Sequence, residues 1–192
     1  IIGMGESSVA EEIEDMFDAK NPTVAPYAKS GEVRLRITAK AETADGADRM
    51  CAPVVDEICS RLGDVVYGTD MNSIEERVVA LLKEKGKKIA TAESCTAGYI
   101  PKRLTDIPGA SEVFECGIVS YSNDIKTKLL GVSPKTLETY GAVSEQTARE
   151  MALGAKRVSG ADIAISTTGL AGPGGDGVLP GGLSFAAVTD GE

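Results

Sequence analysis

The chain has 192 residues, of which 42% are apolar, so it is long enough to bury the core of one large or two small domains. Its net charge of −9 opposes non-specific binding to nucleic acid and anionic membranes, and its aromatic content of 4%, without tryptophan, leaves few side chains on which bases could stack. No apolar run approaches the length of a bilayer span and no secretory signal is visible, so we expect no membrane partner.

Histidine is absent, which excludes serine–histidine triads and histidine-ligated zinc. Any acid–base chemistry must therefore use lysine, aspartate, glutamate, tyrosine or cysteine. The four cysteines form neither a CxxC pair nor a zinc-ligand spacing; they are Cys51, Cys59, Cys95 and Cys116. This pattern predicts free thiols in a reducing cytoplasm and no metal site.

Residues 1–70 are predicted to form a small α+β domain. Ser7 or Ser8 is placed to cap the first helix, and Pro53 is expected to kink or divide the second. The predicted elements are a helix to Ala19, strands at 23–28 and 33–39 joined by a turn at 29–32, a helix at 43–62 and a short strand at 65–67. Their order resembles a KH-type RNA-binding domain. The unit lacks a GxxG loop and has 14 acidic against 7 basic residues, so we expect no nucleic-acid partner.

Residues 71–192 alternate strands with helices. This alternation predicts a mostly parallel sheet with helices on both faces, a three-layer α/β sandwich. The predicted strands lie at 88–92, 114–121, 162–167 and 183–189, and the predicted helices begin near Ser73, Tyr99, Asn123, Pro134 and Ser144. Ligands bind at the carboxyl ends of the strands in such sheets. Three polar or glycine-rich segments follow predicted strands, at 91–98, 121–126 and 168–182.

The segment Thr91-Ala92-Glu93-Ser94-Cys95-Thr96-Ala97-Gly98 joins a strand to a helix. The plain interpretation of Ser94 and Thr96 is that they cap the helix. They also lie where the helix dipole favours an anion or a developing oxyanion. Lys126 is a candidate base for Ser94, provided that its pKa falls from about 10.4 towards 7. The alternative for Lys126 is an ordinary solvated lysine.

The glycine-rich run from Thr168 to Gly182 offers many backbone amides and few bulky side chains. Such a run can cradle phosphate or carbonyl oxygens. It has neither a Walker motif nor a GxGxxG motif, and a flexible hairpin connection remains an equal alternative.

Six motifs, in order, resemble the C-terminal domain of the CinA family, which is a nicotinamide-nucleotide amidase. They are TAESCTAG at 91–98, GASEVF at 109–114, VSYSNxxK at 119–126, GV at 131–132, YGAVS at 140–144 and GLAGP at 169–173. Residues 1–70 resemble the KH-type middle domain of the same family, through NPTVAPYA at 21–28 and LGDxxYG at 62–68. The resemblance implies two domains, at 1–70 and 71–192, and a chain truncated at both ends. The missing N-terminal domain would carry ADP-ribose pyrophosphatase activity, and the missing C-terminal part a closing strand and helix.

The resemblance implies hydrolysis of the carboxamide of nicotinamide mononucleotide to nicotinate mononucleotide and ammonia, in pyridine nucleotide salvage and without a cofactor. It assigns Ser94 as the nucleophile and Lys126 as its base. The positions implied to contact the substrate are Thr96, Ser111, Tyr121, Thr168, Gly169 and Gly172. A homodimer is also implied, and we expect activity in the complete protein more than in this fragment.

One departure from the family pattern is Ala97, where the family usually has glycine; we expect the change to be tolerated. Two alternatives stay open. The domain could be a catalytically silent nucleotide-binding or regulatory module, and Cys95 could replace Ser94 as the nucleophile.

Overall fold

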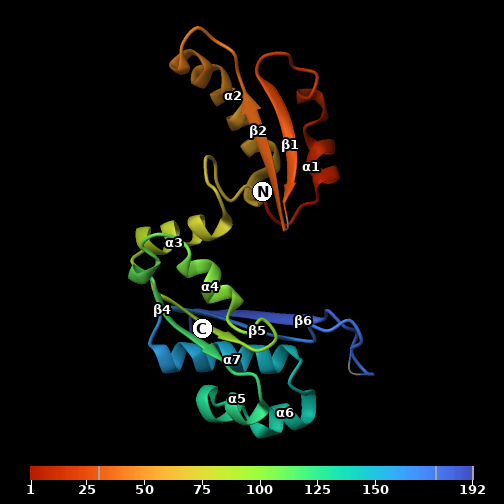
Figure 1. Ribbon diagram of the computed structural model, residues 1–192, viewed down its shortest axis with the longest axis vertical. Helices are drawn as coiled ribbons and strands as arrows, with labels where there is room; N and C mark the ends of the chain where they lie inside the picture. Colours follow the sequence, from red (N-terminus) through yellow and green to blue (C-terminus); the bar gives the residue numbers. More distant parts are fainter. Residues whose placement is uncertain (30, 176, 192) are drawn as a thin grey trace. The chain divides into compact units, whose positions relative to one another are not determined.

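The computed structural model in Figure 1 describes residues 1–29, 31–175 and 177–191. It divides into two compact units, Ile1–Asn72 and Ser73–Glu192, and each has its own core. Ser30 of the predicted turn and Asp176 of the glycine-rich run lie outside the described residues. Among the described helices, none is both long and apolar enough to span a bilayer.

The first unit packs helices against a two-stranded antiparallel sheet. Its elements are α1 (Glu6–Glu12), η1 (Glu14–Met16), β1 (Thr23–Lys29), β2 (Glu32–Thr38), α2 (Ala44–Leu62) and η2 (Gly63–Val65). The apolar residues of β2 alternate with arginines, so one face of the strand joins the core. The buried members of this core are Ile1, Val9, Ile13, Val24, Val33, Ile58 and Leu62. The predicted small α+β unit is therefore present.

Three local predictions in the first unit are wrong. Helix α1 begins after Gly5, not at Ser7 or Ser8, and ends at Glu12 because the chain tightens into the 3₁₀ turn η1. Helix α2 is not divided at Pro53, which is exposed, so the backbone hydrogen bond that proline cannot make is lost on the water-facing side. Residues 65–67 form no described strand; Val65 accepts one hydrogen bond from the Ile2 amide, without a ladder.

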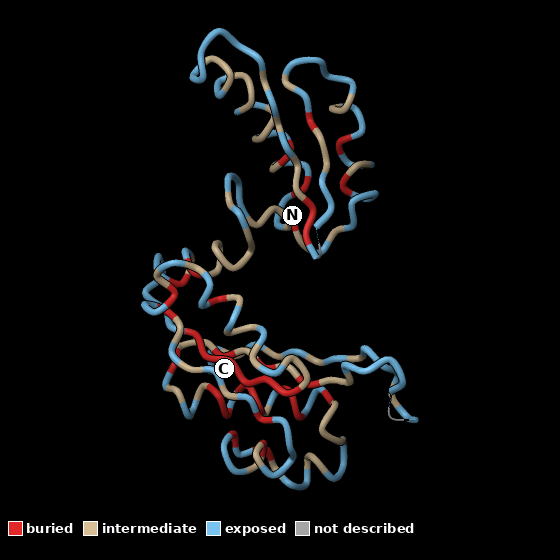
Figure 2. Tube along the Cα trace, in the orientation of Figure 1, coloured by how far each residue is buried: buried red, intermediate tan, exposed pale blue. Residues whose placement is uncertain are grey.

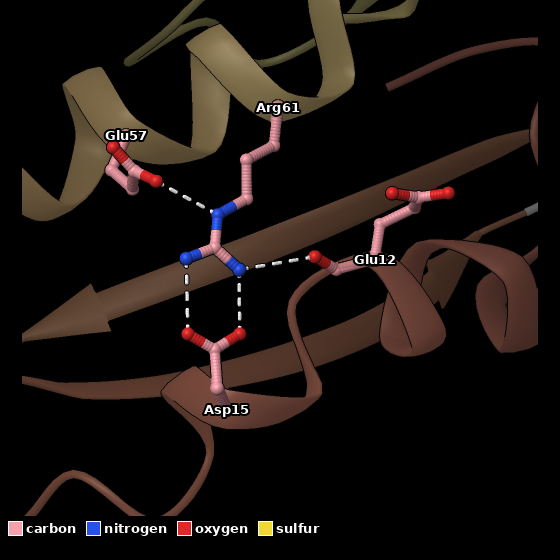
Figure 3. Close-up of polar contacts among 4 residues, drawn as sticks. All are labelled: Glu12, Asp15, Glu57 and Arg61. Carbon is pink, nitrogen blue, oxygen red and sulfur yellow. Dashed lines mark hydrogen bonds and ion pairs between the residues drawn. The ribbon is translucent and has the colours of Figure 1, made fainter.

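Arg61 ties the end of α2 to η1 (Figure 3). Its guanidinium donates to the two carboxylate oxygens of Asp15 at 2.5 and 3.0 Å, and to Glu57 at 2.9 Å. It also donates to the backbone carbonyl of Glu12 at 3.3 Å. The hydrogen bond from Arg61 holds the pKa of Asp15 below its usual range, and the same contact raises the pKa of Arg61. One side chain thus holds two segments that are distant in sequence.

The second unit is built on a four-stranded sheet in the order β4-β3-β5-β6. Its elements are α3 (Ile74–Glu84), β3 (Ile89–Glu93), α4 (Tyr99–Thr105), η3 (Ala110–Glu112), β4 (Phe114–Val119), α5 (Asn123–Leu130), α6 (Pro134–Tyr140), α7 (Glu145–Ser159), β5 (Ile163–Gly169) and β6 (Ser184–Thr189). Strands β4, β3 and β5 are parallel, and β6 is an antiparallel edge strand. The predicted mostly parallel sheet is confirmed.

Helices cover both faces of this sheet. In Figure 1, α3 and α4 lie on one face and α7 on the other, with α5 and α6 packed against α7. All five residues of β3 are buried, as the red tube in Figure 2 shows, because this strand lies between neighbours and between helix layers. Successive side chains of β3 point to opposite faces, so Ile89 packs in the cluster under α3 and α4, and Ala92 in the cluster under α7.

The close approach of α7 to α5 depends on Gly154. A Cβ at this position would meet the backbone carbonyl oxygen of Leu130, the last residue of α5, at only 2.1 Å. We expect Gly154→Ala to destabilise the second unit by about 1–3 kcal/mol, because backbone must move to make room. Urea denaturation would measure the loss. The control is Leu153→Ala, whose side chain is 49% exposed and whose loss should stay within about 0.5 kcal/mol. Equal losses in both variants would contradict this account.

Candidate active site

Ser94 lies one residue beyond the central strand β3, and neighbouring strands hold its backbone on both sides. Its amide donates to the Thr167 carbonyl at 3.0 Å. The preceding carbonyl, of Glu93, accepts from the Ser120 amide at 2.8 Å. Hydrogen bonds therefore join the carboxyl ends of β4, β3 and β5 at the point where the chain turns after Ser94.

The predicted capping by Ser94 and Thr96 is wrong. Ala97 and Gly98 adopt left-handed conformations, with φ of 50° and 96°, so the chain makes an extra turn and α4 begins after Gly98. Glycine has no capping side chain, and a carboxylate oxygen of Glu93 instead accepts the Ile100 amide at 3.2 Å. The Ser94 hydroxyl is consequently free of any capping role.

Lys126 points into the protein and meets Ser94. Its helix α5 begins where the Ser122 hydroxyl accepts the Ile125 amide, and Lys126 lies one turn further along. The side chain is 1% exposed, and its Nζ lies 3.0 Å from the Ser94 Oγ. Lys128, in contrast, is exposed, as expected. Ser94 and Lys126, predicted as nucleophile and base, are thus in direct contact.

The surroundings of Lys126 favour its neutral form. Burial lowers the pKa of the amine, and the weaker opposing influence comes from Cys95. Its other hydrogen-bond acceptors are the carbonyls of Ser120, at 2.7 Å, and Tyr121, at 3.1 Å. In the protonated state the amine donates its three N–H groups to these two carbonyls and to the Ser94 Oγ. After losing one proton it keeps two N–H groups for the two carbonyls, and its lone pair is left facing the Ser94 hydroxyl.

A cavity of about 340 Å³ opens next to this pair. It is lined by Ser94, Cys95, Tyr121, Lys126, Ala142, Val143, Thr168, Gly169, Leu170, Ala171, Gly172, Gly174 and Gly175. Six of the predicted site residues are in this lining. The wall formed by Ala142 and Val143 was missed, because small apolar residues carry no chemical signal; only their place in the YGAVS motif could have indicated it.

Thr168 and the glycine-rich run shape the far wall of the cavity. The buried Thr168 hydroxyl donates to the Ala142 carbonyl at 2.7 Å, which joins β5 to the segment before α7. The run connects β5 to the antiparallel β6, and its base is closed by the Leu170 amide on the Leu183 carbonyl at 2.9 Å. The run is therefore both a hairpin connection and a cavity wall.

Tyr121, in contrast, lies at the opening of the cavity, where its side chain is 75% exposed.

Two predicted substrate contacts do not line the cavity. The Thr96 hydroxyl is paired with the Thr167 hydroxyl at 2.7 Å. Ser111 lies in η3, before β4 begins, whereas Ser94 follows β3. Because β3 and β4 are parallel, the two serines lie at opposite ends of the sheet, separated by the length of a strand, about 3.3 Å per residue. The structure therefore does not bring Ser111 to Ser94 within one chain.

The described residues offer no group of three or more cysteine, aspartate or glutamate side chains that could hold a metal ion. All four cysteines are free. Within the described lining of the cavity, Lys126 is the only cation, and no carboxylate accompanies it. What this arrangement can do chemically is nucleophilic attack by a serine hydroxyl that an uncharged amine deprotonates.

Two sequence families match the chain in adjacent stretches. The family described as "CinA C-terminal domain" matches residues 71–192, and the family described as "Damage-inducible protein CinA KH domain" matches residues 1–68. The resemblance expected from the motifs is confirmed.

Relatives and solved structures agree with these matches. A "Putative competence-damage inducible protein" of Clostridium beijerinckii is 55% identical over 190 residues, covering 98% of this chain and 46% of that protein. A "CinA-like protein" of Desulfovibrio desulfuricans is 50% identical over 188 residues, covering 97% and 44%. The chain thus spans less than half the length of these curated relatives. The crystal structure of competence/damage inducible protein CihA from Agrobacterium tumefaciens is 44% identical, with a TM-score of 0.59, and the match covers 64% of this chain and 75% of that one.

The left-handed conformation of Ala97 predicts how a glycine at this position would change the stability of the second unit. A Cβ is strained at a φ of 50°, whereas glycine adopts this conformation freely. We expect Ala97→Gly to stabilise the second unit by roughly 0.5–1 kcal/mol, read as a higher urea midpoint. The matched control is Ala148→Gly within α7, where glycine should destabilise instead. A lower midpoint for Ala97→Gly would contradict the observed turn.

Proposed function

Because the chain belongs to the CinA family, with a KH domain at residues 1–68 and a CinA C-terminal domain at residues 71–192, we propose that its second unit is an amidase. The proposed reaction hydrolyses the carboxamide of nicotinamide mononucleotide to nicotinate mononucleotide and ammonia. The names of the relatives state no activity, so one observation carries the proposal. It is the buried 3.0 Å contact between the Lys126 amine and the Ser94 hydroxyl, beside an open cavity.

In the acylation step, the lone pair of neutral Lys126 takes the Ser94 proton while the Oγ attacks the carboxamide carbon. The tetrahedral intermediate then collapses, and the protonated amine returns this proton to the departing nitrogen, which leaves as ammonia. A water molecule gives one proton to the same amine and adds its hydroxide to the resulting ester, and the amine passes that proton to the departing Ser94 oxygen. The released carboxylic acid gives its remaining proton to ammonia, so the products are a carboxylate and ammonium, and the Ser94 hydroxyl and the neutral amine are restored.

Backbone amides are the proposed partners of both oxygen-rich parts of the substrate. The amides of Cys95 and Thr96, the two residues that follow Ser94, have no hydrogen-bond partner among the described residues. They could therefore stabilise the oxyanion. The amides of the glycine-rich wall, including Gly169 and Gly172, are the proposed phosphate donors, since the described lining offers no arginine.

Ammonia release from nicotinamide mononucleotide tests the reaction, with the complete natural protein that contains this sequence. We expect turnover in the wild type and a loss of at least about 10³-fold in Ser94→Ala, because acylation has no other activated hydroxyl. Cys95→Ser is the matched control at the neighbouring position and should retain turnover. Activity that survives in Ser94→Ala and disappears in Cys95→Ser would transfer the nucleophile to Cys95. Substrate binding in a calorimeter without ammonia release would favour a silent nucleotide-binding module.

The pH dependence tests the role of Lys126. Since only its neutral form can accept a proton, kcat should rise with pH, with a midpoint below the usual lysine value of about 10.4. Lys126→Arg should be inactive throughout, because guanidinium stays protonated. A wild-type profile that is flat from pH 6 to 10 would contradict a titrating base.

The same shift predicts how stability depends on pH. Burial lowers the folded-state pKa of Lys126 below the unfolded value, so between the two values the unfolded chain binds more protons. Stability therefore rises with pH through this window and is lowest below the folded-state pKa. Wild type should gain stability relative to Lys126→Met as pH rises towards about 10.4, as urea midpoints at several pH values would measure. A difference that stays constant with pH would mean that Lys126 is not shifted.

A further inference from the structure

Glu93 is a buried carboxylate that the proposed reaction does not use. It is the last residue of β3 and directly precedes Ser94, and it is 1% exposed. One carboxylate oxygen accepts the Ile100 amide at 3.2 Å; the other has no partner among the described residues. Buried carboxylates are normally paired with a cation, so a glutamate held by a single backbone amide needs a reason.

The contact from Glu93 to Ile100 closes the turn that carries Ser94. Strand β3 ends at Glu93, and Ile100 is the second residue of α4, so the hydrogen bond spans the whole connection. The N-cap Gly98 offers no side chain, and the second helical amide is one of the two that an N-cap side chain can bind. Glu93 therefore does, from the strand, what a capping residue would do from within the turn.

Glu93 acts on the face of the sheet opposite to Lys126. Its partner Ile100 belongs to α4 and packs in the cluster with Ile89, whereas Lys126 comes from α5, whose Leu130 packs in the cluster with Ala92. Among the described residues, burial is the main influence on the pKa of Lys126 and Cys95 is the opposing one. The influence of Glu93 on catalysis would consequently be geometric and not electrostatic.

We propose that Glu93 is a positioning residue for Ser94: by capping α4 from the end of β3, it fixes the turn that holds the Ser94 hydroxyl against Lys126. The inference rests on the proposed amidase function. Neighbouring strands already fix the backbone on the amino side of Ser94, and Glu93 fixes the carboxyl side of its turn. Displacements of about 1 Å in an active site cost on the order of 10²-fold in rate, so this second fixed point matters for turnover.

Two variants of Glu93 distinguish the effect of its hydrogen bond to Ile100 from the effect of its charge. Glu93→Gln keeps an acceptor oxygen at the same reach and removes the charge, whereas Glu93→Asp keeps the charge and is one methylene too short to reach Ile100. We expect Glu93→Asp to lower kcat by on the order of 10- to 100-fold with KM within about threefold, and Glu93→Gln to keep kcat within about threefold. Neither variant should move the midpoint of the pH–rate profile. Thr91→Val is the control, because Thr91 is on the same strand and face, and its buried hydroxyl has no partner among the described residues.

A second measurement separates this inference from the reaction on which it rests. The rate at which a sulfonyl fluoride labels Ser94, followed by mass spectrometry, reports the reactivity of the hydroxyl without any nucleotide. It should fall about tenfold or more in Glu93→Asp and stay near wild type in Glu93→Gln and Thr91→Val. Labelling that follows this pattern, without ammonia release from nicotinamide mononucleotide, would support the positioning role and reject the substrate.

Three results would overturn the positioning role. The first is labelling and kcat that are unchanged in Glu93→Asp. The second is a loss in Glu93→Gln that equals the loss in Glu93→Asp, or a shifted pH–rate midpoint, since either would mean that the charge matters. The third is a wild-type Ser94 that the sulfonyl fluoride does not label.

Discussion

The contact between the buried Lys126 amine and the Ser94 hydroxyl sets the requirements for the rest of the second unit. Burial disfavours the charged form of an amine, so polar groups of the protein must replace the water that Lys126 has lost. Two backbone carbonyls, from Ser120 and Tyr121, hold the Lys126 nitrogen, and both follow directly after β4. Helix α5 delivers the side chain, and α7 packs close against α5 only because residue 154 has no Cβ. The sheet, the helix layer and the loops thus converge on one nitrogen atom.

Hydrophobic periodicity in the sequence predicted the elements well, and local chemistry was harder to predict. The alternating residues of β2 and the small apolar face of α7 reflect burial, which dominates the energy of a strand or a helix. The cap of α4 was not predictable, because Ser94 and Thr96 fit the usual capping pattern and the acceptor comes from Glu93 instead. The inward direction of Lys126 was likewise hidden, since a short polar helix does not indicate by spacing which face is buried.

Strand direction explains why the candidate site could be predicted only in part. The carboxyl ends of parallel strands meet at one end of the sheet, and residues at or beyond these ends lie together, which is why Ser94, Lys126 and Thr168 come together. Ser111 belongs to a motif of the same family resemblance but precedes its strand, so the chain carries it to the other end. Spacing along a sequence does not distinguish the two cases until the order and direction of the strands are known.

The antiparallel pairing of β6 with β5 has a consequence for how members of this family could diversify. The cavity wall from Leu170 to Leu183 leaves and re-enters the sheet at neighbouring ladder positions, so its ends stay fixed whatever lies between them. Insertions or deletions in that wall would alter the room available to a ligand without displacing the reacting groups, which other strands support. The segment between Leu170 and Leu183 could therefore be replaced by one of another length or sequence, in evolution or by design. Such a change would alter which ligands fit the cavity and would leave Ser94 and Lys126 in position.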